Sequence, residues 1–143
     1  MNVDALRSLY TFCCAIPAQS FKLSEFYDEY GKCGCALGYA AKNKMQGLWL
    51  GKFSLPAYLD TVTGTTHSGM DAAAKAFGID HWDAVRLFAG PGFSSYDEGL
   101  VGTMSDKDLW CHRMEQFFKD NNEPLMAVEV YEDQPKMIAY VFV

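Results

Sequence analysis

The sequence has no long hydrophobic run and no block of like charge. No segment approaches the roughly 20 apolar residues that a membrane-spanning helix needs, and residues 2–16 lack the basic start and long apolar stretch of a secretion signal. Twelve Lys and Arg stand against 18 Asp and Glu, a formal net charge of −6. This balance disfavours nucleic-acid binding, because phosphate contacts depend on cationic side chains. We therefore expect a cytoplasmic protein with no membrane partner and no direct nucleic-acid partner.

A paired cysteine pattern is also missing. The five cysteines are Cys13, Cys14, Cys33, Cys35 and Cys111. Their odd number and the lack of a secretion signal favour reduced thiols. The C-x-C spacing differs from the C-x-x-C pair of structural zinc sites, and no second matched pair follows. The sequence therefore predicts neither a metal site nor a bound cofactor.

Apolar residues, in contrast, are plentiful. Half of the 143 residues are hydrophobic and 15% are aromatic, which suffices for a core without disulfides. A chain of this length fits one domain covering residues 1–143. The predicted fold class is α+β: a compact, mainly helical domain with a small antiparallel β-sheet that includes a C-terminal hairpin. Periodicity and caps predict helices over 3–15, 24–30, 33–43, 68–77, 80–89 and 105–120. Turn residues predict loops over 61–66 and 90–102, and an extended piece is predicted over 48–53. The predicted hairpin has strands over 125–131 and 136–143 around a turn at 132–135.

Local signals fix several helix ends. Ser68 is a predicted N-cap with Asp71 three residues later, and Ser105 precedes Asp108 in the same way. Gly78 is typical of a helix C-terminus. The predicted helix over 33–43 is rich in Gly and Ala, which favours a buried helix whose backbone is closely approached by a neighbour.

A cysteine at a helix start is a candidate nucleophile, because free N–H groups and the helix dipole stabilise a thiolate there. The run 31–36, with Cys33 and Cys35, resembles the helix start of papain-like cysteine enzymes. The resemblance implies a cysteine-dependent hydrolase or transferase with a histidine base, and the loop residue His67 is the best candidate. The run lacks the aromatic residue usual after that nucleophile, and neither C-terminal strand carries the family's histidine. The favoured alternative is that both thiols are small groups chosen for tight packing.

The run 73–87 resembles a helix-turn-helix, which would imply a DNA-binding regulator. Its second helix begins with Asp80, His81 and Asp83, and Arg86 is its only cation. Acidic groups at that end repel the phosphate backbone. A plain helical hairpin within the core is the favoured interpretation.

A broader resemblance covers the middle of the chain. It consists of the run Cys35–Ala41, an Ala-rich helix ending at Phe77-Gly78-Ile79, the run Asp83–Phe88 and the helix after Ser105. In this order the residues are similar to small uncharacterised proteins of bacteria and their phages. The likeness departs over 44–66, does not include the C-terminal hairpin, and implies no activity and no site residues.

Together these observations predict a non-enzymatic protein-binding module, encoded by a phage or mobile element, that inhibits or modulates a host protein. A basic, nucleic-acid-handling defence protein fits the charge sign best. Candidate contact residues lie in the glycine-rich loop: Phe93 and Tyr96 as aromatic anchors, with Asp97 and Glu98 beside them. The alternative for these residues is packing of the loop onto the core. The cysteine enzyme and the helix-turn-helix regulator are the second and third functional hypotheses.

Overall fold

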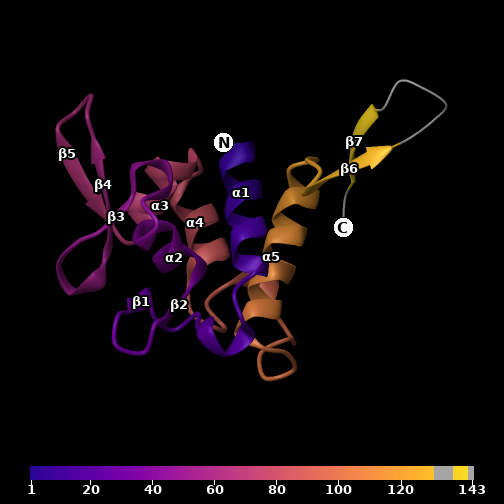
Figure 1. The fold of residues 1–143 in the computed structure, drawn as a ribbon, viewed down its shortest axis with the longest axis horizontal. Helices are drawn as coiled ribbons and strands as arrows, with labels where there is room; N and C mark the ends of the chain where they lie inside the picture. The colour runs from indigo at the N-terminus through magenta and orange to yellow at the C-terminus, as the bar shows by residue number, and fades with distance from the viewer. Residues whose placement is uncertain (131–136, 142–143) are drawn as a thin grey trace.

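The computed structural model describes residues 1–130 and 137–141, with side chains described for residues 1–125. Within this part the chain forms α-helices and small antiparallel sheets, which confirms the predicted α+β class (Figure 1). The helices are α1 (Val3–Cys14), α2 (Ala36–Lys42), α3 (Met70–Phe77), α4 (His81–Phe88) and α5 (Asp106–Asp120). The strands are β1 (Tyr27–Asp28), β2 (Cys33–Gly34), β3 (Trp49–Leu50), β4 (Pro56–Asp60), β5 (Thr65–Ser68), β6 (Met126–Val130) and β7 (Met137–Val141).

The core lies between the helices. α1 contacts α2, α3 and α5, and α4 contacts α3 and α5; Figure 1 shows α1 between α2 and α5. Buried residues from all of these helices form one hydrophobic cluster. Trp110, Met114, Phe117 and Phe118 line the inner face of α5, and all four are buried. None of the described helices combines the length and the apolar character that a bilayer crossing demands.

The C-terminal hairpin is confirmed where the structure describes it. β6 pairs antiparallel with β7, with Met126 opposite Val141 and Val130 opposite Met137. The predicted turn at 132–135 lies outside the described residues.

A three-stranded antiparallel sheet, ordered β3-β4-β5, occupies a region where the sequence predicted mainly a loop. The predicted extended piece over 48–53 is confirmed only at Trp49–Leu50, and the loop prediction over 61–66 is wrong at Thr65 and Thr66, which belong to β5. Asp60 and Gly64 make the tight turn between the long strands: the Val62 N–H donates to the Asp60 carboxylate (2.9 Å) and the Gly64 N–H to the Asp60 carbonyl (2.8 Å). These hydrogen bonds satisfy the turn internally, so Thr65 and Thr66 after it can pair with β4 as strand residues.

The predicted helix over 24–30 is wrong. Residues 27–28 form β1 and pair with β2, and the Cys35 N–H donates to the Glu25 carbonyl at 2.9 Å. For the same reason the helix predicted from residue 33 begins only at Ala36. Backbone hydrogen bonds between segments distant in sequence replace those of a local helix, and tertiary context wins over propensity.

Three predicted helix ends can be compared directly. The Ser105 hydroxyl accepts the Asp108 N–H at 3.1 Å, and Gly78 ends α3 with a left-handed φ of 65°; both predictions are confirmed. Ser68 does not cap α3. It lies on β5, and the N-cap position belongs to Gly69, whose φ is 61°.

The Gly/Ala-rich helix α2 is buried and closely approached, as predicted. A Cβ placed on Gly38 would lie 1.4 Å from the Phe26 carbonyl oxygen and 2.2 Å from the Phe26 carbonyl carbon. Only glycine lets the chain at Phe26 lie against α2.

We predict that Gly38→Ala lowers the free energy of unfolding by at least about 3 kcal/mol, because overpacking costs about 1–3 kcal/mol even where side chains can yield, and a backbone carbonyl cannot rotate away. Helix propensity alone predicts the opposite sign, since Ala is better than Gly by about 1 kcal/mol. Urea denaturation measures the difference.

Gly90→Ala is the matched control, because the carbon added there meets its nearest atom, Phe93 Cδ2, at an ordinary 3.5 Å. A Gly38→Ala protein as stable as this control would contradict the close approach.

Candidate functional site

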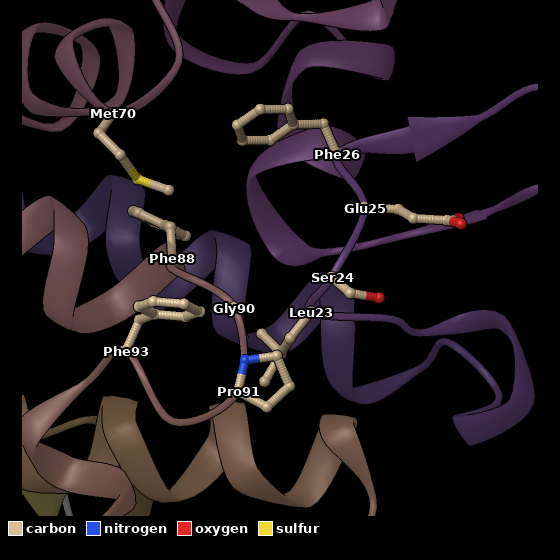
Figure 2. A pocket seen from close by; sticks show the side chains of 9 residues that line it. All are labelled: Leu23, Ser24, Glu25, Phe26, Met70, Phe88, Gly90, Pro91 and Phe93. Atoms are coloured by element: carbon tan, nitrogen blue, oxygen red, sulfur yellow. The ribbon is translucent and has the colours of Figure 1, made fainter.

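An apolar hollow of about 330 Å³ opens where α3, α4 and the segment before β1 meet. Figure 2 shows Met70, Phe88 and Phe93 along one side, with Phe26 pointing toward Met70. Glu25 and Ser24 extend away from the hollow at its rim. We call this feature the Phe93 pocket; it is lined by Leu23, Ser24, Glu25, Phe26, Met70, Phe88, Gly90, Pro91 and Phe93.

The helical hairpin brings two of these walls together. Met70 is the first residue of α3 and Phe88 the last of α4, and the two helices pack against each other, so these ends lie side by side. The opposite wall comes from the chain before β1, where the Leu23 N–H donates to the Asp106 carboxylate on α5 at 2.9 Å. Phe88 and Leu23 are buried floor residues, whereas Phe93 keeps 77% of its surface exposed.

Arg113 on α5 holds the loop that carries Phe93. Its buried guanidinium donates to the Ala89 carbonyl at 2.7 Å and to the Gly90 carbonyl at 3.1 Å. It also donates to both carboxylate oxygens of the buried Asp97, with 2.7 Å between Nε and Oδ1. Asp97 in turn accepts the Gly92 N–H at 3.0 Å. Arg113 therefore binds the carbonyls of Ala89 and Gly90 on one side of Phe93. Through Asp97 it also holds the Gly92 amide in the same turn.

The ionised form of Asp97 is the one that fits this environment. Burial by itself would raise the pKa of the Asp97 carboxyl, but the hydrogen bonds from Arg113 and from the Gly92 amide outweigh it and hold the pKa below its ordinary value. The carboxylate is charged and fully partnered at neutral pH.

The predicted contact residues separate in the structure. Phe93 lines the Phe93 pocket, whereas Asp97 lies behind it in the ion pair with Arg113. Tyr96 is half-buried, and its hydroxyl donates to the Asp120 carboxylate on α5 at 2.8 Å. Glu98 is exposed and lines a different hollow, with Ser95 and Gly99. The role of these residues in binding stays a prediction, but only Phe93 faces the apolar hollow.

The two candidate nucleophiles differ in position. Cys33 lies on β2 rather than at a helix start, and Cys35 is the N-cap residue of α2 with only 1% of its surface exposed. Burial raises the pKa of the Cys35 thiol to about 11, although nearby backbone amides at the start of α2 act in the opposite direction. Burial also raises the pKa of Cys33; Lys22 opposes this rise, while the carboxylates of Glu25 and Asp28 add to it.

His67 is not joined to either thiol by any hydrogen bond within residues 1–125. It lies on β5, opposite Tyr58, away from β2 in Figure 1. There it lines a hollow with His81 and Asp71, whose Nδ1 and Oδ1 are 2.8 Å apart. Among residues 1–125, neither candidate thiol is therefore paired with the predicted histidine base.

The helix pair α3–α4 exists as the sequence predicts, and the charges at the start of α4 are engaged internally. Asp80 caps α4 by accepting the Asp83 N–H at 2.7 Å. The Arg86 guanidinium donates to the Asp83 carboxylate one turn earlier on the same helix. The would-be recognition helix thus offers phosphates no cation that lacks an acidic partner, in keeping with the disfavoured DNA-binding interpretation.

One group among the described residues has ligand atoms spaced for a metal ion: Glu25, Asp28 and Cys33, with all three ligand atoms within 4.8 Å of one another. Sequence reasoning missed the two carboxylates because it searched for a second cysteine or histidine pair. It also missed the walls of the Phe93 pocket. Leu23 precedes a segment predicted as a helix, and Phe26 lies within it. Met70 and Phe88 lie in two other predicted helices, and nothing in the sequence indicates that they share a cavity.

We predict that Asp97→Asn lowers the free energy of unfolding at pH 7 by about 3–5 kcal/mol, the usual cost of breaking a buried ion pair from one side. Since the folded-state pKa of Asp97 lies below its unfolded value, its contribution is present above about pH 4 and is lost as pH falls through the folded pKa. Urea denaturation of both proteins between pH 7 and pH 2.5 checks this: the gap narrows toward low pH.

Glu98→Gln is the matched control, an exposed carboxylate next in sequence, with an expected change within about 0.5 kcal/mol. If Asp97→Asn and Glu98→Gln change the free energy of unfolding equally at every pH, the ion pair with Arg113 does not stabilise the fold.

Alkylation of the native protein separates packing thiols from a reactive one. With iodoacetamide at pH 7.5 we expect the exposed Cys14 to be modified first, and the buried Cys13 and Cys35 only after unfolding, because protonated and buried thiols are inert. Peptide mapping by mass spectrometry gives the rate at each site. Alkylation of Cys33 or Cys35 in the folded chain with a midpoint below about pH 8 would restore the enzyme hypothesis.

The Phe93 pocket can offer apolar contact and an aromatic anchor, and its only titratable lining residue, Glu25, is directed away from it. No protein-family model, curated protein or solved structure matches the chain.

Proposed function

We propose that this chain is a non-enzymatic protein-binding module whose partner inserts an apolar side chain at the Phe93 pocket. The observation that carries the proposal is an aromatic side chain, 77% exposed, standing beside a hollow lined almost wholly by apolar groups. Burying such a ring contributes about 1.5–3 kcal/mol, and aromatic anchors at pockets dominate the energetics of protein interfaces.

The position of Phe93 supports a rigid anchor rather than a mobile one. Its turn is fixed on both sides by Arg113 and Asp97, so little conformational freedom remains to be lost on binding. Phe53 is even more exposed, at 94%, but it lies in a short 3₁₀ turn and does not line the Phe93 pocket.

A basic surface is the proposed partner chemistry. The chain carries a net charge of −6, and Glu25 stands at the rim of the pocket. Opposite charges speed encounter and orient the two proteins, while the apolar anchor supplies affinity. A nucleic-acid-handling host protein has such a surface. The resemblance suggested by the sequence, carried by Cys35–Ala41, Phe77-Gly78-Ile79, Asp83–Phe88 and the helix after Ser105, favours a phage or mobile-element accessory that inhibits or modulates such a protein.

We expect Phe93→Ala to weaken partner binding by about 2 kcal/mol or more, roughly 30-fold in Kd, because it removes the anchor from the pocket rim. Native and variant chains are immobilised, and proteins retained from the host are compared by quantitative mass spectrometry. The captured protein is then purified, and its Kd for each chain is measured by calorimetry.

Phe53→Ala is the matched control, because it removes an exposed ring of the same size at another site. The proposal fails if folded Phe93→Ala binds the purified partner as tightly as the native chain, or if both variants lose binding equally. A Kd that does not rise with salt would remove the basic surface from the proposal while leaving the pocket.

A further inference from the structure

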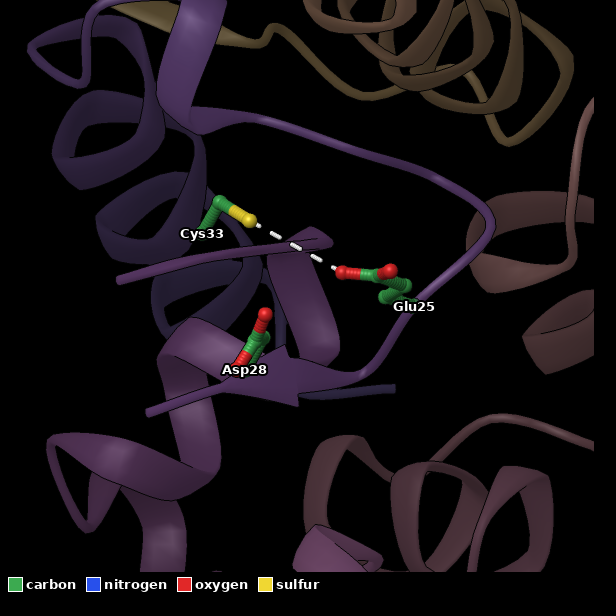
Figure 3. Close-up of side chains that lie close together, drawn as sticks. All are labelled: Glu25, Asp28 and Cys33. Atoms are coloured by element: carbon green, nitrogen blue, oxygen red, sulfur yellow. Dashed lines mark hydrogen bonds between the residues drawn. The ribbon is translucent and has the colours of Figure 1, made fainter. Parts of the chain in front are cut away.

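We propose that Glu25, Asp28 and Cys33 form a binding site for Zn²⁺. Their three ligand atoms lie within 4.8 Å of one another, and the Cys33 sulfur is 3.7 Å from a carboxylate oxygen of Glu25 (Figure 3). The carboxylate of Asp28 points toward the same space. Thiolate and carboxylate are both established zinc ligands, and the three side chains would draw together around the ion to reach its usual bond lengths of about 2.0–2.3 Å.

The backbone places all three ligands without help from a metal. Asp28 on β1 is the direct partner of Cys33 on β2, so their side chains share one face of the hairpin. Glu25 is fixed three residues earlier, because its carbonyl accepts the Cys35 N–H at 2.9 Å. A site that is largely formed beforehand loses little entropy when the ion binds.

The orientation of the thiol is a separate observation that points to a ligand. Cys33 is only 6% exposed, yet its sulfur is directed at the carboxylates (Figure 3). Its one hydrogen bond among the described residues is the long contact to Glu25. Cysteine that only fills space normally meets apolar atoms, whereas a cation would satisfy the thiolate and both carboxylates together.

Gly31 keeps the approach to these ligands open. A Cβ at this position would lie 2.9 Å from Asp28 Oδ2 and 3.4 Å from Cys33 Sγ. The donor set also selects among ions: one sulfur with two oxygens suits Zn²⁺, while Ca²⁺ and Mg²⁺ prefer oxygen ligands alone. Three protein ligands leave the fourth position of a tetrahedral zinc ion for water.

Titration of the reduced, full-length chain with Co²⁺ tests the site, because cobalt replaces zinc and reports sulfur ligation through a near-ultraviolet charge-transfer band. We expect the band to saturate at one equivalent and to disappear when Zn²⁺ is added. Cys33→Ser should abolish it. Asp28→Asn should weaken Zn²⁺ binding, measured by competition, at least about 10-fold, since even the loss of an outer partner of a ligand costs about 10–100-fold.

Two matched control variants test whether the loss of Co²⁺ binding is specific to these three ligands. Cys14→Ser removes an exposed thiol elsewhere, and Glu29→Gln removes the neighbouring carboxylate that faces Lys42. Both should bind Co²⁺ within about twofold of the native chain.

A band that survives in Cys33→Ser, or that is lost equally in Cys14→Ser, overturns the proposal, as does a native chain with no band. If Cys33→Ser fails to fold by circular dichroism, Asp28→Asn and Gly31→Ala decide, and Co²⁺ affinity unchanged in both rejects the site. Glu25 also stands at the rim of the Phe93 pocket, but none of these variants changes a residue that lines the pocket, so this proposal and the proposed function can fail separately.

Discussion

The buried Arg113 is the constraint on which the described architecture depends most. It donates hydrogen bonds to the carbonyls of Ala89, the C-cap residue of α4, and of Gly90, and it pairs with Asp97 from the following loop. A charge buried in a helical core is costly unless it is fully partnered. Here the partners come from three consecutive parts of the chain, so α4, α5 and the glycine-rich loop can take only one relative arrangement. The exposed Phe93 sits on the turn that this arrangement fixes, and the ordered loop therefore positions the candidate binding site.

Features encoded within a few residues could be predicted from the sequence. Ser105 and Asp80 cap the helices that they precede, and Gly78 ends its helix in the left-handed conformation that favours glycine. The inner face of α5 and the C-terminal hairpin follow from periodicity in the same way. The close approach at Gly38 was predicted from composition, although the atom that approaches it, the Phe26 carbonyl, could not be named.

Features that depend on distant segments could not be predicted. Leu23 and Phe26, and likewise Glu25 and Asp28, are three residues apart, a spacing that also fits a helix. The helix is not formed, because Cys35 supplies backbone hydrogen bonds to that stretch, and β2 pairs with β1. The same nonlocal pairing creates the carboxylate and thiol cluster. The sequence predicts Asp97 as a contact residue in an exposed loop. Its buried ion pair could not be predicted, because the arginine partner lies 16 residues later in the chain.

Gly38 links the two candidate sites. Because Gly38 has no side chain, the backbone of Phe26 can lie against α2. Phe26 lines the Phe93 pocket and directly precedes β1. Leu23 and Phe26 supply apolar surface to the Phe93 pocket, whereas the carboxylates of Glu25 and Asp28 lie close to the Cys33 sulfur. The small residues of α2 therefore act by letting chain segments touch, and the chemistry lies in the segment that they hold. Cys35, the buried N-cap residue of α2, belongs to the packing group, whereas Cys33, two residues earlier on β2, belongs to the cluster.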